Sequence, residues 1–202
     1  MAKVYPETHT TSYMTSNRET FTVWMKSLVF HGNGCTVYDT NGKIVYRMDN
    51  YEKSRSNEVY LMDLKGTVLF SIQRKKVILP YFGHWDIEKW CGCKEKNKER
   101  RTPWFRARKR SSILGRDMVC RVTLGHDKAT SNGYTILGLV GNNLSFKITD
   151  TRGQLVAEVK QKQLDSGIML GDDVLTMVVE PQIDHSLVMA LVTVYGLMRD
   201  LI

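Results

Sequence analysis

The sequence of 202 residues predicts an all-β barrel, in which about twelve antiparallel strands close around one hydrophobic C-terminal helix. Three observations lead to this prediction. Polar and apolar residues alternate with a period of two over most of the chain, as in strands with one buried face. The most apolar segment lies at the C-terminal end. With only 4 prolines and 15 glycines, the chain contains no long flexible linker.

The predicted strands are rich in β-branched and aromatic residues, which suit a pleated sheet. Short polar turns separate most of them, and Asn41-Gly42 is a strong hairpin signal because both turn positions favour positive φ. The predicted strands are residues 19–25, 35–39, 43–48, 58–63, 67–73, 77–82, 103–109, 118–124, 134–140, 145–150, 154–160 and 174–180.

A short motif recurs in the chain. Asp39–Val45 is matched by Asp150–Val156 at an offset of 111 residues, and Asp63–Leu69 is a weaker copy. In each copy an aspartate can accept hydrogen bonds from the turn, and a glycine supplies a left-handed backbone conformation. The motif can be a general feature of hairpins, but the matching threonine and valine favour a duplication of the two halves of the barrel.

Residues 183–201 are predicted to form the central helix. The uncharged run Ser186–Met198 has 13 residues, whereas a bilayer-spanning helix needs about 20. The run is apolar on nearly all sides, so a helix here must be surrounded by other parts of the protein. Asp184 is the expected N-cap. We therefore favour a buried core helix over a membrane anchor and predict no transmembrane span.

The chain is expected to form a single domain over residues 16–202, preceded by a flexible segment at 1–15. The N-terminal residues do not resemble a secretory signal. The four cysteines (Cys35, Cys91, Cys93 and Cys120) match neither a disulfide scaffold nor a zinc site. These features predict a reduced protein of the cytoplasm or nucleus, and we expect a monomer.

Catalytic motifs are absent from the sequence, so we predict a protein that is not an enzyme and uses no cofactor or metal. The histidines are dispersed, and His31 and His84 are expected at strand ends. The aromatic group at 81–85, together with Trp90, is more typical of a turn packed on the barrel mouth than of a site wall. Gly171-Asp172-Asp173 lacks the alternating oxygen ligands of a calcium loop.

The excess positive charge is concentrated in one segment. Lys94–Arg110 carries a net charge of +7, out of +8 for the whole chain. Such a cluster attracts anionic surfaces, although a solvated loop without a partner is the simpler interpretation. In strand 103–109, alternation places Arg106, Arg108 and Arg110 on one face and Phe105, Ala107 and Lys109 on the other. The candidate residues for an anionic ligand are Arg100, Arg101, Arg106, Arg108, Lys109 and Arg110.

Several segments resemble one known family. They are Phe21–Lys26, Asp39–Gly42, Gly66–Ile72, and Asp173–Pro181 followed by Asp184 and Met189–Leu191. In order and spacing they resemble the LURP-one-related (LOR) family, mainly of plants, over about residues 16–202. That family belongs to the tubby C-terminal-like superfamily, with the phospholipid scramblases. The resemblance implies a closed barrel around a C-terminal helix and a link to plant defence. It implies no site residues, because tubby's phosphoinositide-binding positions have no match here.

Two functions are compatible with these features. The first is a peripheral module that binds anionic phospholipid headgroups, such as phosphoinositides, through the basic segment and its neighbouring aromatic residues. The alternative is a nucleic-acid or protein-interaction module in transcriptional regulation, since the same arginines can contact phosphates. The expected locations are the cytoplasm, with the membrane surface or the nucleus as further sites.

Overall fold

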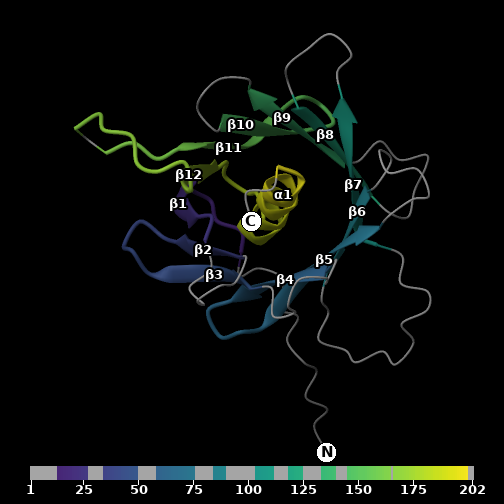
Figure 1. Ribbon diagram of the computed structural model, residues 1–202, viewed down its shortest axis with the longest axis horizontal. Helices are drawn as coiled ribbons and strands as arrows, with labels where there is room; N and C mark the ends of the chain where they lie inside the picture. The colour runs from purple at the N-terminus through teal and green to yellow at the C-terminus, as the bar shows by residue number, and fades with distance from the viewer. Residues whose placement is uncertain are drawn as a thin grey trace, which may run out of the picture.

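A computed structural model shows a closed barrel of twelve antiparallel strands with a single helix inside it, which confirms the predicted fold class (Figure 1). It describes residues 13–26, 34–49, 58–75, 84–89, 103–111, 118–124, 133–139, 145–164 and 166–199. The elements are β1 (Glu19–Trp24), β2 (Gly34–Tyr38), β3 (Ile44–Asp49), β4 (Glu58–Asp63), β5 (Val68–Lys75), β6 (His84–Lys89), β7 (Phe105–Ser111), β8 (Met118–Leu124), β9 (Gly133–Leu139), β10 (Ser145–Asp150), β11 (Leu155–Gln161), β12 (Val174–Val179) and α1 (His185–Met198).

The strands follow one another around the barrel in chain order, and each pairs with its neighbours in the sequence. The barrel closes where β1 pairs with β12, from Glu19 opposite Val179 to Trp24 opposite Val174. This pairing leaves the sheet without a free edge, where another chain could otherwise add. The first and last strands of the barrel are thus held side by side.

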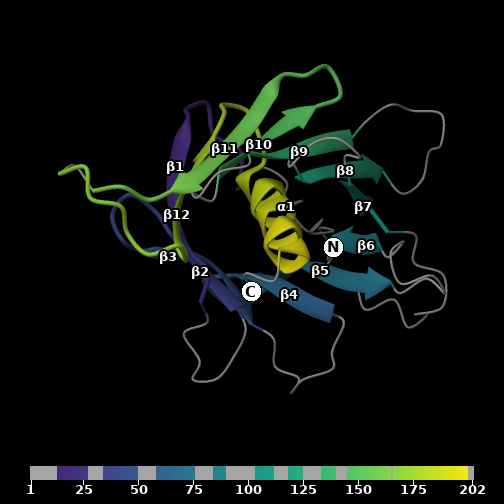
Figure 2. The ribbon, with the colours of Figure 1, turned by 45° about the horizontal axis from the view of Figure 1, so that its top comes forward.

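The helix α1 fills the interior of the barrel, as Figures 1 and 2 show from two directions. Every residue from His185 to Gly196 is buried. The helix therefore has no polar face, and its apolar side chains pack in all directions against the inward-facing residues of the strands. Phe146 and Tyr195 lie in direct contact in this core, with ring centroids 4.2 Å apart.

The start of the helix is fixed by two sets of hydrogen bonds. Asp184 is the N-cap, and its Oδ1 accepts from the N–H groups of Ser186 and Leu187 at 2.9 and 3.2 Å. This confirms the predicted cap. The His185 N–H donates to the carbonyl of Tyr13, so residues from inside the segment 1–15 lie against the start of the helix.

The three copies of the recurring motif adopt the same hairpin. In each, the aspartate Oδ1 accepts hydrogen bonds from the N–H groups two and four residues later, at 2.8–2.9 Å. The glycine N–H donates to the carbonyl of that aspartate, and the strand register shifts just before the turn. A type I turn followed by a left-handed residue and a bulge is a common hairpin, so hairpin geometry accounts for the motif without a duplication. The aspartates are Asp39, Asp63 and Asp150, and the glycines, with φ of 76, 79 and 80°, are Gly42, Gly66 and Gly153.

The sequence prediction missed one strand, β6 at His84–Lys89. The predicted strand 77–82 lies outside the described residues. His84 is the first residue of β6, as expected of a histidine at a strand end. The expected aromatic turn was wrong at its end, because Trp85 is part of β6 and pairs with Arg74. This strand was not predicted because it buries Asp86, and aspartate is rarely buried without a partner.

Candidate functional site

The basic strand β7 alternates as predicted over its first half. Phe105 and Ala107 are buried, whereas Arg106 is half-buried and Arg108 is exposed. Lys109 is also exposed, although alternation puts it on the same side as Phe105 and Ala107. The backbone of Arg110 is in β7, but its side chain, like all of Arg100 and Arg101, lies outside the described part of the chain.

Strand pairing extends the basic surface beyond β7. Arg108 lies opposite His84 on β6 and opposite Arg121 on β8, and His84 lies opposite Lys75 on β5. Directly opposed residues of an antiparallel pair project from the same face with Cβ atoms about 4.5–5.5 Å apart. Four neighbouring strands thus present one line of side chains, Lys75–His84–Arg108–Arg121, which we call the basic row. Opposed like charges destabilise a sheet, so the row carries a cost to stability.

The adjacent row contains the acidic side chain Asp86. Its Oδ1 accepts from Arg106 Nε at 2.8 Å and lies 3.5 Å from His84 Nε2. The Asp86 side chain is only 8% exposed, and Arg106 supplies the charge that allows its burial. The Arg106 guanidinium is therefore occupied by its ion pair with Asp86. Of the two arginines, Arg108 is the exposed one that a ligand could contact. Within the described part of the chain, neither Arg108 nor Arg121 forms an ion pair.

Burial and the charged neighbours of His84 shift the pKa of its imidazole. Burial lowers the pKa of its imidazole, and Arg106, Arg108 and Lys75 lower the pKa further, while Asp86 raises it. The net direction is downward, so the neutral form of His84 is favoured. The row thus combines three cations with one neutral imidazole.

Aromatic rings border the same strands. The Arg74 guanidinium lies 5.8 Å from the centroid of the Trp85 ring, and Lys89 Nζ lies 4.8 Å from that of Trp104. Trp104 stacks on the buried Phe70 at 5.8 Å, so this indole is fixed from the core side. Both indoles pack against the barrel core, and Trp85 lies opposite the buried Ala107, so its ring is on the inner face of the sheet and not on the face of the basic row.

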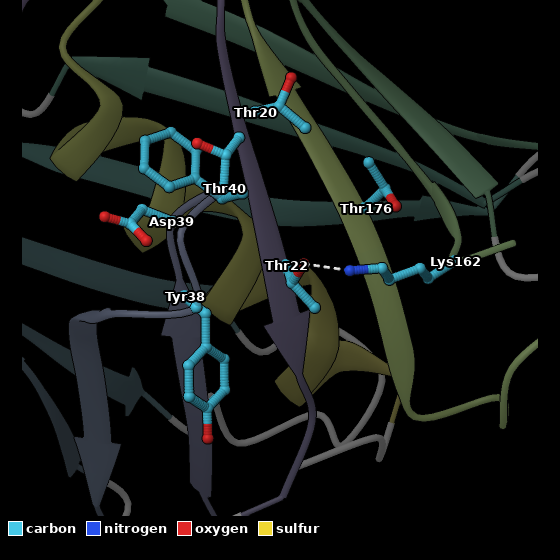
Figure 3. A pocket seen from close by; sticks show the side chains of 9 residues that line it. Thr20, Thr22, Tyr38, Asp39, Thr40, Lys162 and Thr176 are labelled. Atoms are coloured by element: carbon cyan, nitrogen blue, oxygen red, sulfur yellow. Dashed lines mark hydrogen bonds between the residues drawn. The ribbon is translucent and has the colours of Figure 1, made fainter. Parts of the chain in front are cut away.

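A second feature is a groove of about 440 Å³ on the other side of the barrel, beside β1 (Figure 3). Residues from β1, β12, the β2–β3 turn and the segment after β11 meet there. Lys162 Nζ lies across the surface and donates to Thr22 Oγ1 at 2.6 Å, as the dashed line shows. The groove is lined by Thr20, Phe21, Thr22, Tyr38, Asp39, Thr40, Gly42, Lys162 and Thr176.

Other classes of site find less support in the described residues. They contain no group of three or more histidine, cysteine or acidic side chains that could hold a metal. Cys35 and Cys120 are free and buried, and burial raises the pKa of the Cys120 thiol to about 12, which disfavours a reactive thiolate. Cys91 and Cys93 lie outside the described residues. The only described helix is too short to cross a membrane.

Sequence reasoning found one member of the basic row, Arg108, and missed the other three. Lys75, His84 and Arg121 lie outside the charged segment Lys94–Arg110, and strand register alone brings them into line with Arg108. Alternation within 118–124 places Arg121 on an outer face, which is the signal that was available. No sequence pattern around Lys162 predicted its place in the groove, because its hydrogen-bond partner Thr22 is 140 residues away in the chain.

Comparisons with known proteins agree with this fold. The model of the LURP-one-related family matches residues 19–196. The chain is 47% identical to LURP-one-related 4 of Arabidopsis thaliana, over all of this chain and 88% of that protein, and 44% identical to LURP-one-related 3, over 93% and 82%. Its fold is similar to the X-ray structure of another protein from that plant, with a TM-score of 0.59 at 14% identity over 89% of this chain and 90% of the other.

Proposed function

The chain belongs to the LURP-one-related family, and from that premise we propose that it is a non-enzymatic binding module for anionic phospholipid headgroups. The observation that carries the proposal is the basic row. Three cations and a histidine lie side by side on four neighbouring strands. A regulatory role in plant defence is part of the same proposal and rests on the family resemblance.

The chemistry of the row suits a phosphorylated headgroup. Arginine presents a planar fork of donors that binds two phosphate oxygens at once, and Arg108 and Arg121 are adjacent. Lysine binds phosphate as a point charge, and Lys75 is two strands away from Arg108. A headgroup with more than one phosphate can therefore contact several members of the row together.

The surroundings of the row favour a membrane over a free ligand. The candidates Arg100, Arg101, Lys109 and Arg110 belong to the same basic segment of the sequence. Basic residues near an anionic leaflet each contribute about 1 kcal/mol. Binding through this face needs no segment that crosses the bilayer.

Liposome co-sedimentation tests the proposal. Vesicles of phosphatidylcholine with added phosphatidylinositol bisphosphate are expected to bind the protein, and pure phosphatidylcholine vesicles are not. The double substitution Arg108→Glu and Arg121→Glu is expected to weaken binding about tenfold or more, since each lost cation removes about 1 kcal/mol. The control is Lys43→Glu with Lys65→Glu, the same charge change in two exposed turns away from the row.

Equal binding to both vesicle types would exclude the proposal, as would equal losses in the two double variants. Duplex DNA offers the same phosphates and represents the alternative function. A filter-binding titration at low salt decides between them, because affinity for DNA without affinity for the vesicles would favour the nucleic-acid module.

A further inference from the structure

We propose that the groove beside β1 binds a small polyhydroxylated carboxylate, the chemistry of a sugar acid. The groove arises where two strands separate. All six residues of β1 pair with β12, but pairing with β2 covers only Thr22 to Trp24. Toward the start of β1 the β2–β3 turn leaves the sheet, and the space of about 440 Å³ lies between them. That volume is within the range of small-ligand sites, about 300–1,000 Å³.

Lys162 supplies the charge for the carboxylate. Its ammonium group is partly buried, and its hydrogen bond is to a neutral hydroxyl, that of Thr22. Among the described residues it forms no ion pair. Glu158 on β11 is paired with Lys160 at 2.9 Å, and Asp173, just before β12, is paired with Lys26 at 2.7 Å. A ligand anion would complete the missing pair.

The other groups of the groove suit hydroxyls. Thr22 and Thr176 lie beside Lys162, while Thr40 and Asp39 lie on the other side of β1 (Figure 3). A threonine hydroxyl both donates and accepts, as a sugar hydroxyl does. The Asp39 Oδ1 is used by the turn, where it accepts from the N–H groups of Asn41 and Lys43, and its Oδ2 remains to accept from a ligand.

The charges of the lining define the ligand class. One lysine at one end and one aspartate at the other fit a ligand with a single negative charge and neutral donors. A multiply phosphorylated headgroup would meet Asp39 as a like charge, which disfavours it. An apolar ligand would bury the hydroxyls without partners. The ring of Tyr38 is the aromatic surface against which a sugar can pack.

This site is independent of the basic row. The groove lies on β1, β2 and β12, whereas the row lies on β5 to β8 (Figure 1). The double substitution Arg108→Glu with Arg121→Glu in the basic row is therefore expected to leave ligand binding in the groove unchanged. A negative result for lipid binding at the row would not contradict the groove proposal, and the reverse also holds.

The test is an NMR titration with three probes, which follows the backbone amide signals of Thr20, Thr22 and Thr176. Glucuronate carries both the carboxylate and the hydroxyls, glucose carries only hydroxyls, and acetate only the carboxylate. Glucuronate is expected to bind about tenfold more tightly than glucose, the worth of one charge-assisted hydrogen bond, and about tenfold more tightly than acetate, the worth of two ordinary hydrogen bonds to the hydroxyls. Lys162→Met is expected to remove this advantage, and Lys160→Met, the neighbouring lysine paired with Glu158, is expected to keep it.

Three results would overturn the assignment: equal affinity for glucuronate and acetate, equal affinity for glucuronate and glucose, or an unchanged titration in Lys162→Met. If Lys162→Met does not fold, Thr176→Val replaces it, since valine has the same shape and suits a strand. That variant removes one hydroxyl of the lining and is expected to weaken glucuronate binding severalfold.

Discussion

The Tyr46 hydroxyl lies 2.6 Å from His185 Nδ1, inside the barrel, and joins strand β3 to the first residue of the central helix. Burial raises the pKa of Tyr46 and lowers that of His185, so both groups are neutral. The rings of Tyr13 and Phe21 enclose the histidine, with centroids 5.7 and 5.2 Å from it. The contact between Tyr46 and His185 is therefore buried within the core.

Tyr46→Phe is expected to lower the free energy of unfolding by about 1–3 kcal/mol. The substitution keeps the ring but leaves the buried Nδ1 of His185 without its partner, and an unsatisfied buried group has this cost. Urea denaturation measures the change. Tyr38→Phe, at a half-buried tyrosine on the outer face, is the matched control and is expected to change stability by less than about 0.5 kcal/mol. Equal losses in the two variants would show that the contact does not stabilise the fold.

Stability is expected to fall as the pH drops below about 6.5, the usual pKa of an unfolded histidine. Burial lowers the folded pKa of His185 and outweighs Asp184 and Glu19, which raise it. Between the two pKa values the unfolded state binds more protons, so stability is full above 6.5 and is lost toward the folded value. Urea titrations from pH 7.5 to 5 measure this slope. His185→Gln cannot titrate, so its slope should be shallower, and an unchanged slope would rule out this source.

His84 is expected to titrate below its usual value, and its neighbours set the direction of further shifts. Arg108 lowers its pKa, so Arg108→Gln should raise that pKa, whereas Asp86→Asn should lower it by removing the one carboxylate that opposes burial. NMR titration of the imidazole ring signals gives both values. If both variants shift the pKa of His84 in the same direction, Arg108 and Asp86 do not have opposite effects on it, and the prediction is wrong.

Leu191→Ala is expected to lower the free energy of unfolding by about 2–5 kcal/mol, because Leu191 is fully buried in the helix and its truncation leaves a cavity. Thermal and urea denaturation measure the loss. Leu164→Ala is the matched control: that leucine is 45% exposed, so a change of less than about 0.5 kcal/mol is expected. A small effect at Leu191 would mean that the helix is not tightly packed in the barrel.

Gly153→Ala is expected to destabilise the β10–β11 hairpin by about 1–2 kcal/mol. The glycine has a φ of 80°, and a Cβ atom there would meet no other atom within 4 Å, so the cost is one of backbone conformation alone. Gly153→Asn should cost less, since asparagine tolerates the left-handed region. Unfolding curves of the two variants separate these cases, and equal losses would point to a cause other than φ.

The sequence predicted the features that depend on neighbouring residues. An apolar run without a polar face implies burial, and an aspartate followed three residues later by glycine implies a hairpin. Features that depend on partners from distant segments were not predictable. Asp86 is buried only because Arg106 lies on the next strand, so β6 did not look like a strand. Lys75 and Arg121 join Arg108 through strand register, and Lys162 meets Thr22 across 140 positions of the chain.

The position of α1 after all twelve strands in the chain has a consequence for synthesis on the ribosome. The strands emerge first, and the helix that fills the barrel interior is translated after all of them. Until then the inward faces of the strands have nothing to cover them, and β1 has to wait for β12 before it gains its second neighbour. The nascent chain therefore completes its hydrophobic core late, a stage at which chaperones that bind apolar surface have the longest opportunity to act.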